Sequence, residues 1–217
     1  MTRLPNVRLI ISWLLSGMRI VNLLHSQYQM TMTTFPIPIR EQVSPANQIL
    51  FDNLTKFAGH VPNLYAIFAW SEDALGNYLT LQSGQSSLKV KEREVINLVV
   101  SQVNGCEYCL SAHTYIAKKL GFTDEQILAI RQASILFDKR LDALAKLVKS
   151  IVENKGHSRY MLDLFFAAGY TRGSLVDAVI AIGDKVITNY LYALTDVPID
   201  YPIVPSGINQ KGDSSFC

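Results

Sequence analysis

The sequence predicts an all-α fold, and three observations support this prediction. From Ser44 onward, apolar residues recur every three or four positions nearly throughout. Strand-like alternation of apolar and polar residues never lasts more than a few positions. The pattern is interrupted by residues that begin or end helices, such as Pro62 before one apolar stretch and Gly121 after another. With 217 residues, of which 49% are hydrophobic and 18% charged, the chain is long enough to bury one substantial core.

The predicted helices of the first half of the chain follow from apolar stripes that turn residues separate. The first stripe ends at Gly59 and contains Ile49, Leu50, Leu54 and Phe57. Pro62 restarts the chain into the next stripes, whose members are Leu64, Ile67, Phe68, Leu75, Tyr78, Leu79 and Leu81. A polar turn at residues 83–87 precedes a helix over 91–103, in which the inward-facing residues are predicted to be Val95, Ile96, Val99, Val100 and Val103.

The later helices have stronger boundary signals. Asn104 and Gly105 end the helix over 91–103, and Cys106 opens a helix that Gly121 closes. Residues 123–126, Thr-Asp-Glu-Gln, form a capping box for the next helix. Three further helical segments are predicted at 138–154, 158–168 and 174–194. An irregular tail then begins, marked by Pro198, Pro202 and Pro205.

One helical domain is predicted between two terminal extensions. Residues 1–31 contain three Arg and no acidic residue, and their apolar stretch is too short to span a bilayer. We therefore predict an N-terminal leader at 1–31, a helical domain at 32–205 and a polar tail at 206–217. Because Met30 and Met32 stand at the start of this domain, we hypothesise that translation naturally begins there. Without residues 1–31, and hence without three Arg, the formal charge falls from +2 to −1.

Composition excludes two classes of partner. A formal charge of +2 is too small for a nucleic-acid-binding surface, and no run of Lys and Arg alternates with aromatic residues. No membrane-spanning segment is predicted. Three cysteines with one close pair are not typical of a small secreted domain with many disulfides, so we predict a reducing compartment, the cytoplasm. Cys217 ends the polar tail and is assigned no role.

The segment Cys106-Glu107-Tyr108-Cys109 places two thiols one helical turn apart at the start of a helix. This spacing allows a disulfide to form and break with limited movement of the backbone. The partial positive charge of a helix N-terminus favours the thiolate, which is the reactive form of cysteine. His113 lies four residues after Cys109, on the same helix face, where an imidazole can exchange a proton with either sulfur.

Glu94 lies on the preceding helix, twelve positions before Cys106. The tight turn at Asn104 and Gly105 folds the two helices against each other, which brings the carboxylate of Glu94 toward His113 or Cys109. Because Glu94 stands among apolar residues, we predict that burial raises its pKa and lets it shuttle protons near neutrality.

These four residues, Glu94, Cys106, Cys109 and His113, match in type and spacing the signature of the alkylhydroperoxidase D-like family. That family lies within the carboxymuconolactone decarboxylase-like superfamily. The chain resembles the family from about Phe35 to Asp200, and residues 103–106 and 60–63 resemble its peroxidase-related members. The resemblance implies an all-helical bundle that assembles as a homo-oligomer, usually a trimer or hexamer.

The resemblance also implies a role for each of the four residues. Cys109 is implied to be the peroxidatic thiolate, and Cys106 the resolving thiol that closes an internal disulfide. Glu94 and His113 are implied to form the proton relay. The substrates would be a peroxide and a thiol or dithiol reductant, with no organic cofactor and no metal. Some family members carry a histidine directly before the second cysteine, where this chain has Tyr108, and we expect this departure to affect the strength of peroxidase activity.

Other candidate residues are predicted to be structural. His60 stands at a helix entry, and His157 precedes another helix. Asn189 and Tyr190 are able to approach the pocket from the last long helix, but an aromatic residue at helical spacing is usually part of the core. His25 falls in the leader and is assigned no role.

Three alternative functions remain open on the sequence. The four residues of the signature are also the right types to bind zinc. The cysteine pair would equally serve a non-catalytic, redox-responsive oligomer or a thiol-disulfide exchanger. Decarboxylation of a lactone is a minor alternative, because the decarboxylases of the superfamily act without this cysteine pair.

Overall fold

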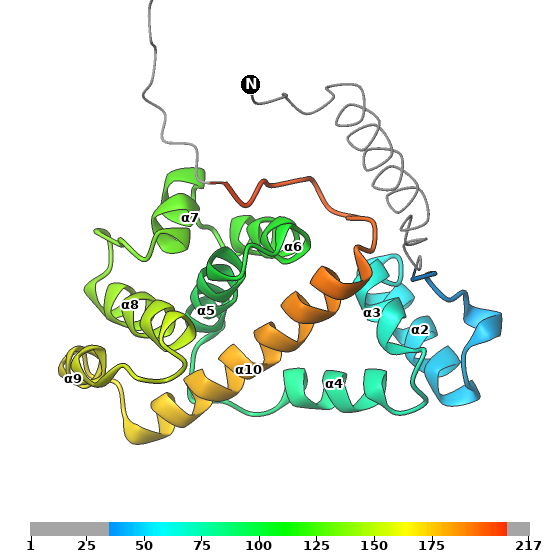
Figure 1. The fold of residues 1–217 in the computed structure, drawn as a ribbon, viewed down its shortest axis with the longest axis horizontal. Coiled ribbons are helices and arrows are strands. Elements are labelled where there is room, and N and C mark those ends of the chain that lie inside the picture. Colours follow the sequence, from blue (N-terminus) through cyan, green and yellow to red (C-terminus); the bar gives the residue numbers. More distant parts are fainter. Residues whose placement is uncertain (1–34, 208–217) are drawn as a thin grey trace, which may run out of the picture. The chain divides into compact units, whose positions relative to one another are not determined.

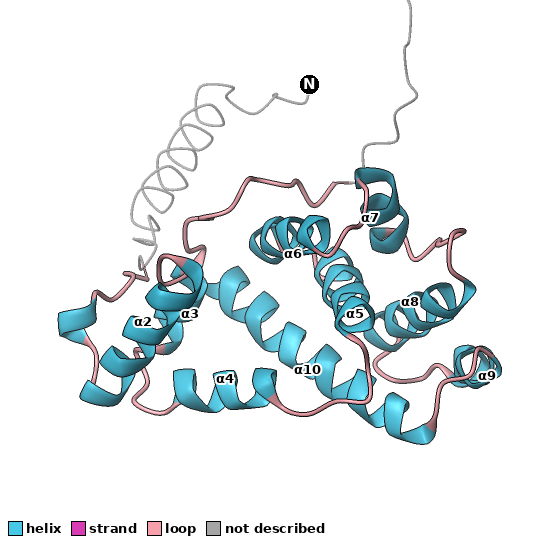
Figure 2. Cartoon of the chain, turned by 180° about the vertical axis from the view of Figure 1, so that it is seen from behind, coloured by secondary structure: helices cyan, strands magenta, loops and turns pink. Residues whose placement is uncertain are grey.

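The computed structural model describes residues 35–207, and every regular element in this range is a helix. Figure 2 shows these helices joined by loops, without a strand among the described residues. The elements are η1 Arg40–Gln42, α2 Pro45–Ala58, α3 Asn63–Phe68, α4 Ala74–Ser83, α5 Val90–Val103, α6 Glu107–Lys119, α7 Asp124–Arg131, α8 Lys139–Glu153, α9 Arg159–Ala167 and α10 Arg172–Thr195. The predicted all-α fold is confirmed.

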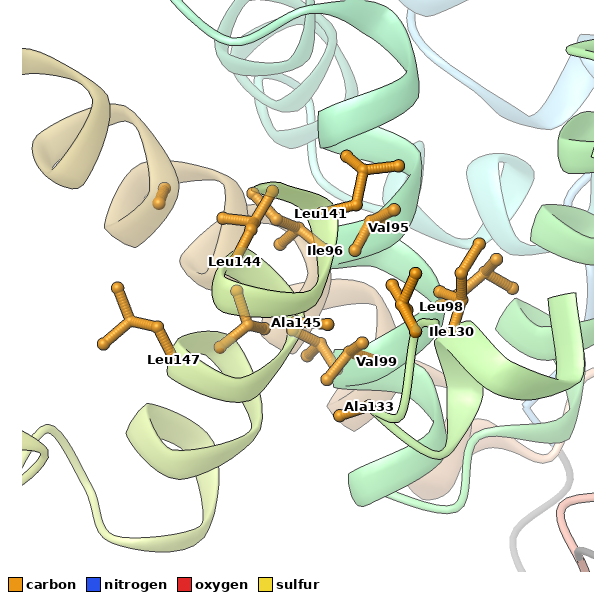
Figure 3. Close-up of a cluster of buried hydrophobic side chains, with 14 of the residues drawn as sticks. Val95, Ile96, Leu98, Val99, Ile130, Ala133, Leu141, Leu144, Ala145 and Leu147 are labelled. Carbon is orange, nitrogen blue, oxygen red and sulfur yellow. The ribbon is translucent and has the colours of Figure 1, made fainter. Parts of the chain in front are cut away.

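Helix α5 is the centre of the fold, and more than half of its residues are buried. It packs against α6, α7, α8 and α10 (Figure 1). Its side chains that are fully shielded from solvent are Val95, Ile96, Leu98, Val99 and Val100. Figure 3 shows several of them among Leu141, Leu144 and Ala145 of α8 and Ile130 of α7. The predicted inward face of this helix is therefore confirmed, apart from Val103, which is only partly buried.

Helix α10 crosses the domain and packs against helices from both earlier and later parts of the chain. Its 24 residues span roughly 36 Å at the usual rise per residue. Along this length it contacts α8 and α5 and then α6, α4 and α3 (Figure 1). It begins at Arg172, two residues before the predicted start, because Thr171 and Ser174 form a capping box there.

The first predicted apolar stripe is partly wrong. Leu50 and Leu54 are partly buried, but Ile49 and Phe57 are 61% and 94% exposed. The buried face of α2 is instead formed by Phe51 and by Asn47. The amide of Asn47 donates hydrogen bonds to the backbone oxygens of Ala69 and Ser71, which pays for burying this polar side chain.

The predicted leader at 1–31, with Met30 and His25, lies outside the described residues, as do most of the polar tail and Cys217. Within residues 35–207, no helix is both long and apolar enough to cross a membrane.

Candidate active site

The turn between α5 and α6 sets the positions of both cysteines. Gly105 takes a left-handed conformation, with φ of 65°, which reverses the chain immediately after α5. The backbone N–H of Cys106 then donates to the carbonyl of Ser101 at 2.9 Å. Cys106 is thus the N-cap of α6, and its sulfur accepts a hydrogen bond of 3.4 Å from the backbone N–H of Cys109. Both residues are free thiols and are buried.

His113 and Glu94 form a buried pair beside the cysteines. His113 lies one helical turn after Cys109 on α6, and its Nδ1 is 2.8 Å from Oε1 of Glu94 on α5. The second carboxylate oxygen of Glu94 accepts a hydrogen bond of 3.2 Å from the side-chain amide of Asn97. Because the carboxylate engages Nδ1, the Nε2 atom of His113 is left to exchange a proton with other groups.

Helix α10 adds Asn189 and Lys185 to this cluster. Asn189 is buried between α5 and α6, where its amide donates to Oγ of Ser101 at 3.4 Å and its oxygen accepts from the side chain of Asn104 at 2.9 Å. Asn189 also helps to lower the pKa of Cys109. Lys185, one turn earlier on α10, is only 2% exposed.

The two thiols are held in different protonation states. The hydrogen bond from Cys106 is the main cause that lowers the pKa of Cys109 to about 6, with further help from Lys185, His113 and Asn189 against the opposing effect of burial. The same hydrogen bond, together with burial, raises the pKa of Cys106. At neutral pH, Cys109 is therefore the thiolate and Cys106 the thiol that donates to it.

The prediction of a raised pKa for Glu94 is wrong. Burial acts in that direction, but His113, Asn97 and Lys185 outweigh it and hold the pKa of Glu94 below its ordinary value. Glu94 is a carboxylate at neutral pH, so it can orient His113 and stabilise the imidazolium rather than carry the proton itself.

A cleft of about 490 Å³ opens onto the Glu94–His113 pair. Its walls come from α3, α4, α5, α6 and α10. Apolar side chains at the cleft that are themselves more than a third exposed are Leu81, Val90, Ile116 and Ile180. Polar groups that line it include Gln82, Arg93 and Asp184. His113 and Glu94 line the cleft, whereas the two cysteines do not.

The predicted irregular tail is an ordered strap, residues 196–207, which lies along α6. Backbone and side-chain groups of the strap hydrogen-bond to α3, α5, α6 and α7 through Asn63, Gln102, Glu107, Ser111 and Arg131. Val197 packs in one apolar cluster with Cys106, Cys109 and Tyr108. The strap therefore covers the side of the thiol pair that faces away from the cleft.

Tyr108, the residue between the cysteines, links this apolar cluster to α3. Its hydroxyl accepts a hydrogen bond of 3.2 Å from the backbone N–H of Leu64. Its ring meets Tyr201 of the strap edge-on, at 5.8 Å between ring centres. Tyr108 is buried in these contacts and does not face the Glu94–His113 pair.

The structure thus brings together all four residues of the signature. Asn189 joins them, whereas Tyr190 is 60% exposed and does not. His60 lies at the helix entry and contacts Asp200 of the strap, at 3.4 Å between Nε2 and Oδ2. His157 is exposed before α9. Among residues 35–207, no group of three or more His, Cys, Asp or Glu side chains is arranged to hold a metal ion.

Lys185 was missed in the sequence, although its position carried a signal. Ala178, Ile182, Lys185 and Asn189 follow one another at helical spacing, and all four are buried. A lysine within such an apolar series marks a buried charge.

Comparison with known proteins finds a family model that matches the part of the chain that holds this site. Residues 68–149, which include all four residues of the signature, match the model of the carboxymuconolactone decarboxylase family. The uncharacterised protein YdfG of Bacillus subtilis (strain 168) is 44% identical over 46 residues, which make up 21% of this chain and 31% of that protein. The chain thus matches less than a third of the length of this relative.

Solved structures show the same fold. An uncharacterised peroxidase-related protein from Silicibacter sp. TM1040 is 21% identical, with a TM-score of 0.67 over 78% of this chain and 92% of that one. An alkylhydroperoxidase AhpD core protein from Ralstonia eutropha JMP134 is 16% identical, with a TM-score of 0.68 over 79% and 93%. The debrominase Bmp8, in complex with 2,3,4-tribromopyrrole, is 15% identical, with a TM-score of 0.65 over 79% and 93%.

Proposed function

Because residues 68–149 match the carboxymuconolactone decarboxylase family and solved peroxidase-related proteins share the fold, we propose that this chain is a thiol-dependent peroxidase of the alkylhydroperoxidase D type. The observation that carries the proposal is the asymmetry of the thiol pair. The pKa of Cys109 is lowered to about 6 by the hydrogen bond from Cys106 and by Lys185, His113 and Asn189. A reactive thiolate beside a protonated thiol is the arrangement that a two-cysteine peroxidase needs.

In the first step, the thiolate of Cys109 attacks the O–O bond of the peroxide. An S–O bond forms, the O–O bond breaks, and the departing alkoxide or hydroxide takes a proton from Nε2 of protonated His113. Glu94, 2.8 Å from Nδ1, stabilises the positive charge of the imidazolium before the transfer. Cys109 is left as a sulfenic acid.

In the second step, the sulfur of Cys106 attacks the sulfenic sulfur of Cys109. A disulfide forms and water leaves with the thiol proton of Cys106 and the sulfenic hydroxyl. A thiol or dithiol reductant then restores both thiols. The proposal includes a cytoplasmic setting, which supplies such reductants, and a homo-oligomeric assembly, a trimer or hexamer.

Steady-state consumption of cumene hydroperoxide and hydrogen peroxide with dithiothreitol tests the proposal. We expect Cys109→Ser to abolish turnover. Glu94→Gln keeps the size of the side chain but loses the charge that supports His113, and we expect kcat/KM to fall by a factor of about 10². Cys106→Ser is expected to react with one equivalent of peroxide and to accumulate Cys109 as a sulfenic acid, detected as its dimedone adduct by mass spectrometry.

Cys217→Ser is the matched control and is expected to leave turnover unchanged. Bmp8 shows that this fold also serves a debrominase, so turnover has to be measured with peroxide itself. A wild-type protein that forms the Cys106–Cys109 disulfide but turns over no peroxide with any dithiol would contradict the peroxidase. A redox-responsive oligomer or a thiol-disulfide exchanger would then take its place.

A further inference from the structure

Lys185 is a buried charged residue that has no role in the proposed relay of Glu94 and His113. It is 2% exposed, and no other lysine among the described residues is buried. Its ammonium group makes no hydrogen bond or ion pair with the part of the chain that the structure describes. Burying an ammonium ion costs several kcal/mol unless opposite charges compensate it, on the order of the penalty for any ion taken out of water. The compensating charges must therefore lie close to Lys185.

The position of Lys185 on α10 shows where these charges are. Asn189, one turn further along the same face, hydrogen-bonds Ser101 and Asn104 at the C-terminal end of α5. Lys185 lies on this same buried face of α10, which packs against α5 and α6, and its charge lowers the pKa of Glu94, Cys106 and Cys109. The titratable groups around this cluster are Glu94 on α5, Cys106, Cys109 and His113 on α6, Tyr65 on α3, Tyr78 on α4 and Asp184 on α10 itself.

The charges around Lys185 indicate that its ionic partner is the thiolate of Cys109. Glu94 already has a cationic partner when His113 is protonated, and its two oxygens are engaged by His113 and Asn97. For Cys109, the strongest favourable influence after the hydrogen bond from Cys106 is the charge of Lys185, ahead of His113 and Asn189. One buried ammonium and one buried thiolate neutralise each other, which makes both less costly to bury.

We propose that Lys185 is a positioning residue of the peroxidase, which holds Cys109 as a thiolate by keeping a permanent positive charge in the buried cluster. This inference rests on the proposed function in one respect only, namely that Cys109 is the reacting thiol. Lys185 takes no part in the proton transfer. The proton that the departing oxygen takes comes from His113, and the electron pair of the new S–O bond comes from Cys109.

The test is a titration of the thiolate absorbance at 240 nm, which needs no peroxide and no access of a reagent to the buried sulfur. The signal of Cys109 is the difference between each protein and its Cys109→Ser counterpart, between pH 4 and pH 9. Tyrosines of the cluster do not interfere, since burial raises the pKa of Tyr65 to about 12. Lys185→Met removes the charge and keeps an apolar stem of similar length. Lys185→Arg keeps the charge.

We expect Lys185→Met to raise the midpoint of Cys109 by about one pH unit or more, the usual effect of losing a close opposite charge. Lys185→Arg is expected to restore most of this shift. Lys149→Met is the matched control, because Lys149 is an exposed partner of Glu153 on α8, and its loss is expected to leave the midpoint unchanged. If Lys185→Met does not fold, as judged by circular dichroism, Lys185→Gln takes its place in the same titration.

An unchanged midpoint in the folded variant would overturn the inference and would make Lys185 a counter-charge of Glu94 alone. The two proposals fail separately. A shifted midpoint in a protein that turns over no peroxide keeps the role of Lys185 and removes the peroxidase. Peroxide turnover by a protein whose Cys109 midpoint does not shift in Lys185→Met keeps the peroxidase and removes the role of Lys185.

Discussion

At the scale of single residues, the chemistry of the site depends on a difference between two cysteines three positions apart. Cys106 is the N-cap of α6, whereas Cys109 lies inside the first turn of the helix, toward His113. The hydrogen bond between the two sulfurs raises the pKa of one and lowers the pKa of the other. The spacing of the pair therefore does more than permit a disulfide, because it sets the pKa values of the two sulfurs apart.

The rate of peroxide reduction is expected to follow the ionisation of Cys109. The thiol form is inactive, so kcat/KM falls as the pH drops through about 6, where the thiolate takes up a proton. Above this pH the thiolate is fully formed and its ionisation no longer limits kcat/KM. The measurement is kcat/KM for cumene hydroperoxide between pH 4.5 and pH 9, with Cys217→Ser as the control. A fall in kcat/KM centred near pH 8.5, the ordinary pKa of a cysteine, would contradict the lowered pKa of Cys109.

The four residues of the signature could be found in the sequence because their spacing along two adjacent helices is fixed by the turn between them. Lys185 and Asn189 come from a helix about 80 positions later, and no local spacing connects them with Cys109. The protonation state of Glu94 was predicted wrongly for the same reason. Burial can be inferred from apolar neighbours in the sequence, but the opposing charge of Lys185 enters only through tertiary contacts.

At the scale of elements, several helix ends were predictable because a residue with a defined capping role marks them, although the start of α10 was missed by two residues despite its Thr171–Ser174 capping box. The ends near Gly59, Gly105 and Gly121 agree with the structure, and each of these glycines has a positive φ. The course of the strap was not predictable. Its prolines indicate an irregular backbone, but its hydrogen bonds go to side chains of four different helices, which carry no pattern in the sequence.

The contact between α5 and α8 is expected to supply much of the stability of the domain. Leu144 of α8 is fully buried against α5, so Leu144→Ala should leave a cavity and lower the free energy of unfolding by about 2–5 kcal/mol. Leu136→Ala is the same substitution at a side chain that is 95% exposed, and we expect a change within about 0.5 kcal/mol. Urea denaturation followed by circular dichroism measures both. Equal losses for the two variants would contradict the packing described for α8.

At the scale of the whole molecule, the described residues leave an apolar face of α10 uncovered. Val176, Val179, Ile187, Tyr190 and Leu194 recur at helical spacing along this helix, and each is at least 43% exposed. Its C-terminal part borders an almost purely apolar groove, formed with Phe35, Phe68, Trp70 and Ala74. Monomeric proteins rarely expose an apolar patch that extends along a whole helix.

We therefore expect the protein to be a homo-oligomer that buries this face of α10. Sedimentation velocity at micromolar concentration should give a mass that is a multiple of 24.3 kDa. The double variant Tyr190→Lys and Leu194→Lys places two charges in the face and should shift the protein toward the monomer, because a buried unpaired charge opposes association. Leu136→Lys is the control, since Leu136 is 95% exposed and lies outside α10, and the sedimenting mass of this variant should equal that of the wild type. A wild type that sediments as a monomer, or a double variant that stays fully associated, would show that this face of α10 is not the interface.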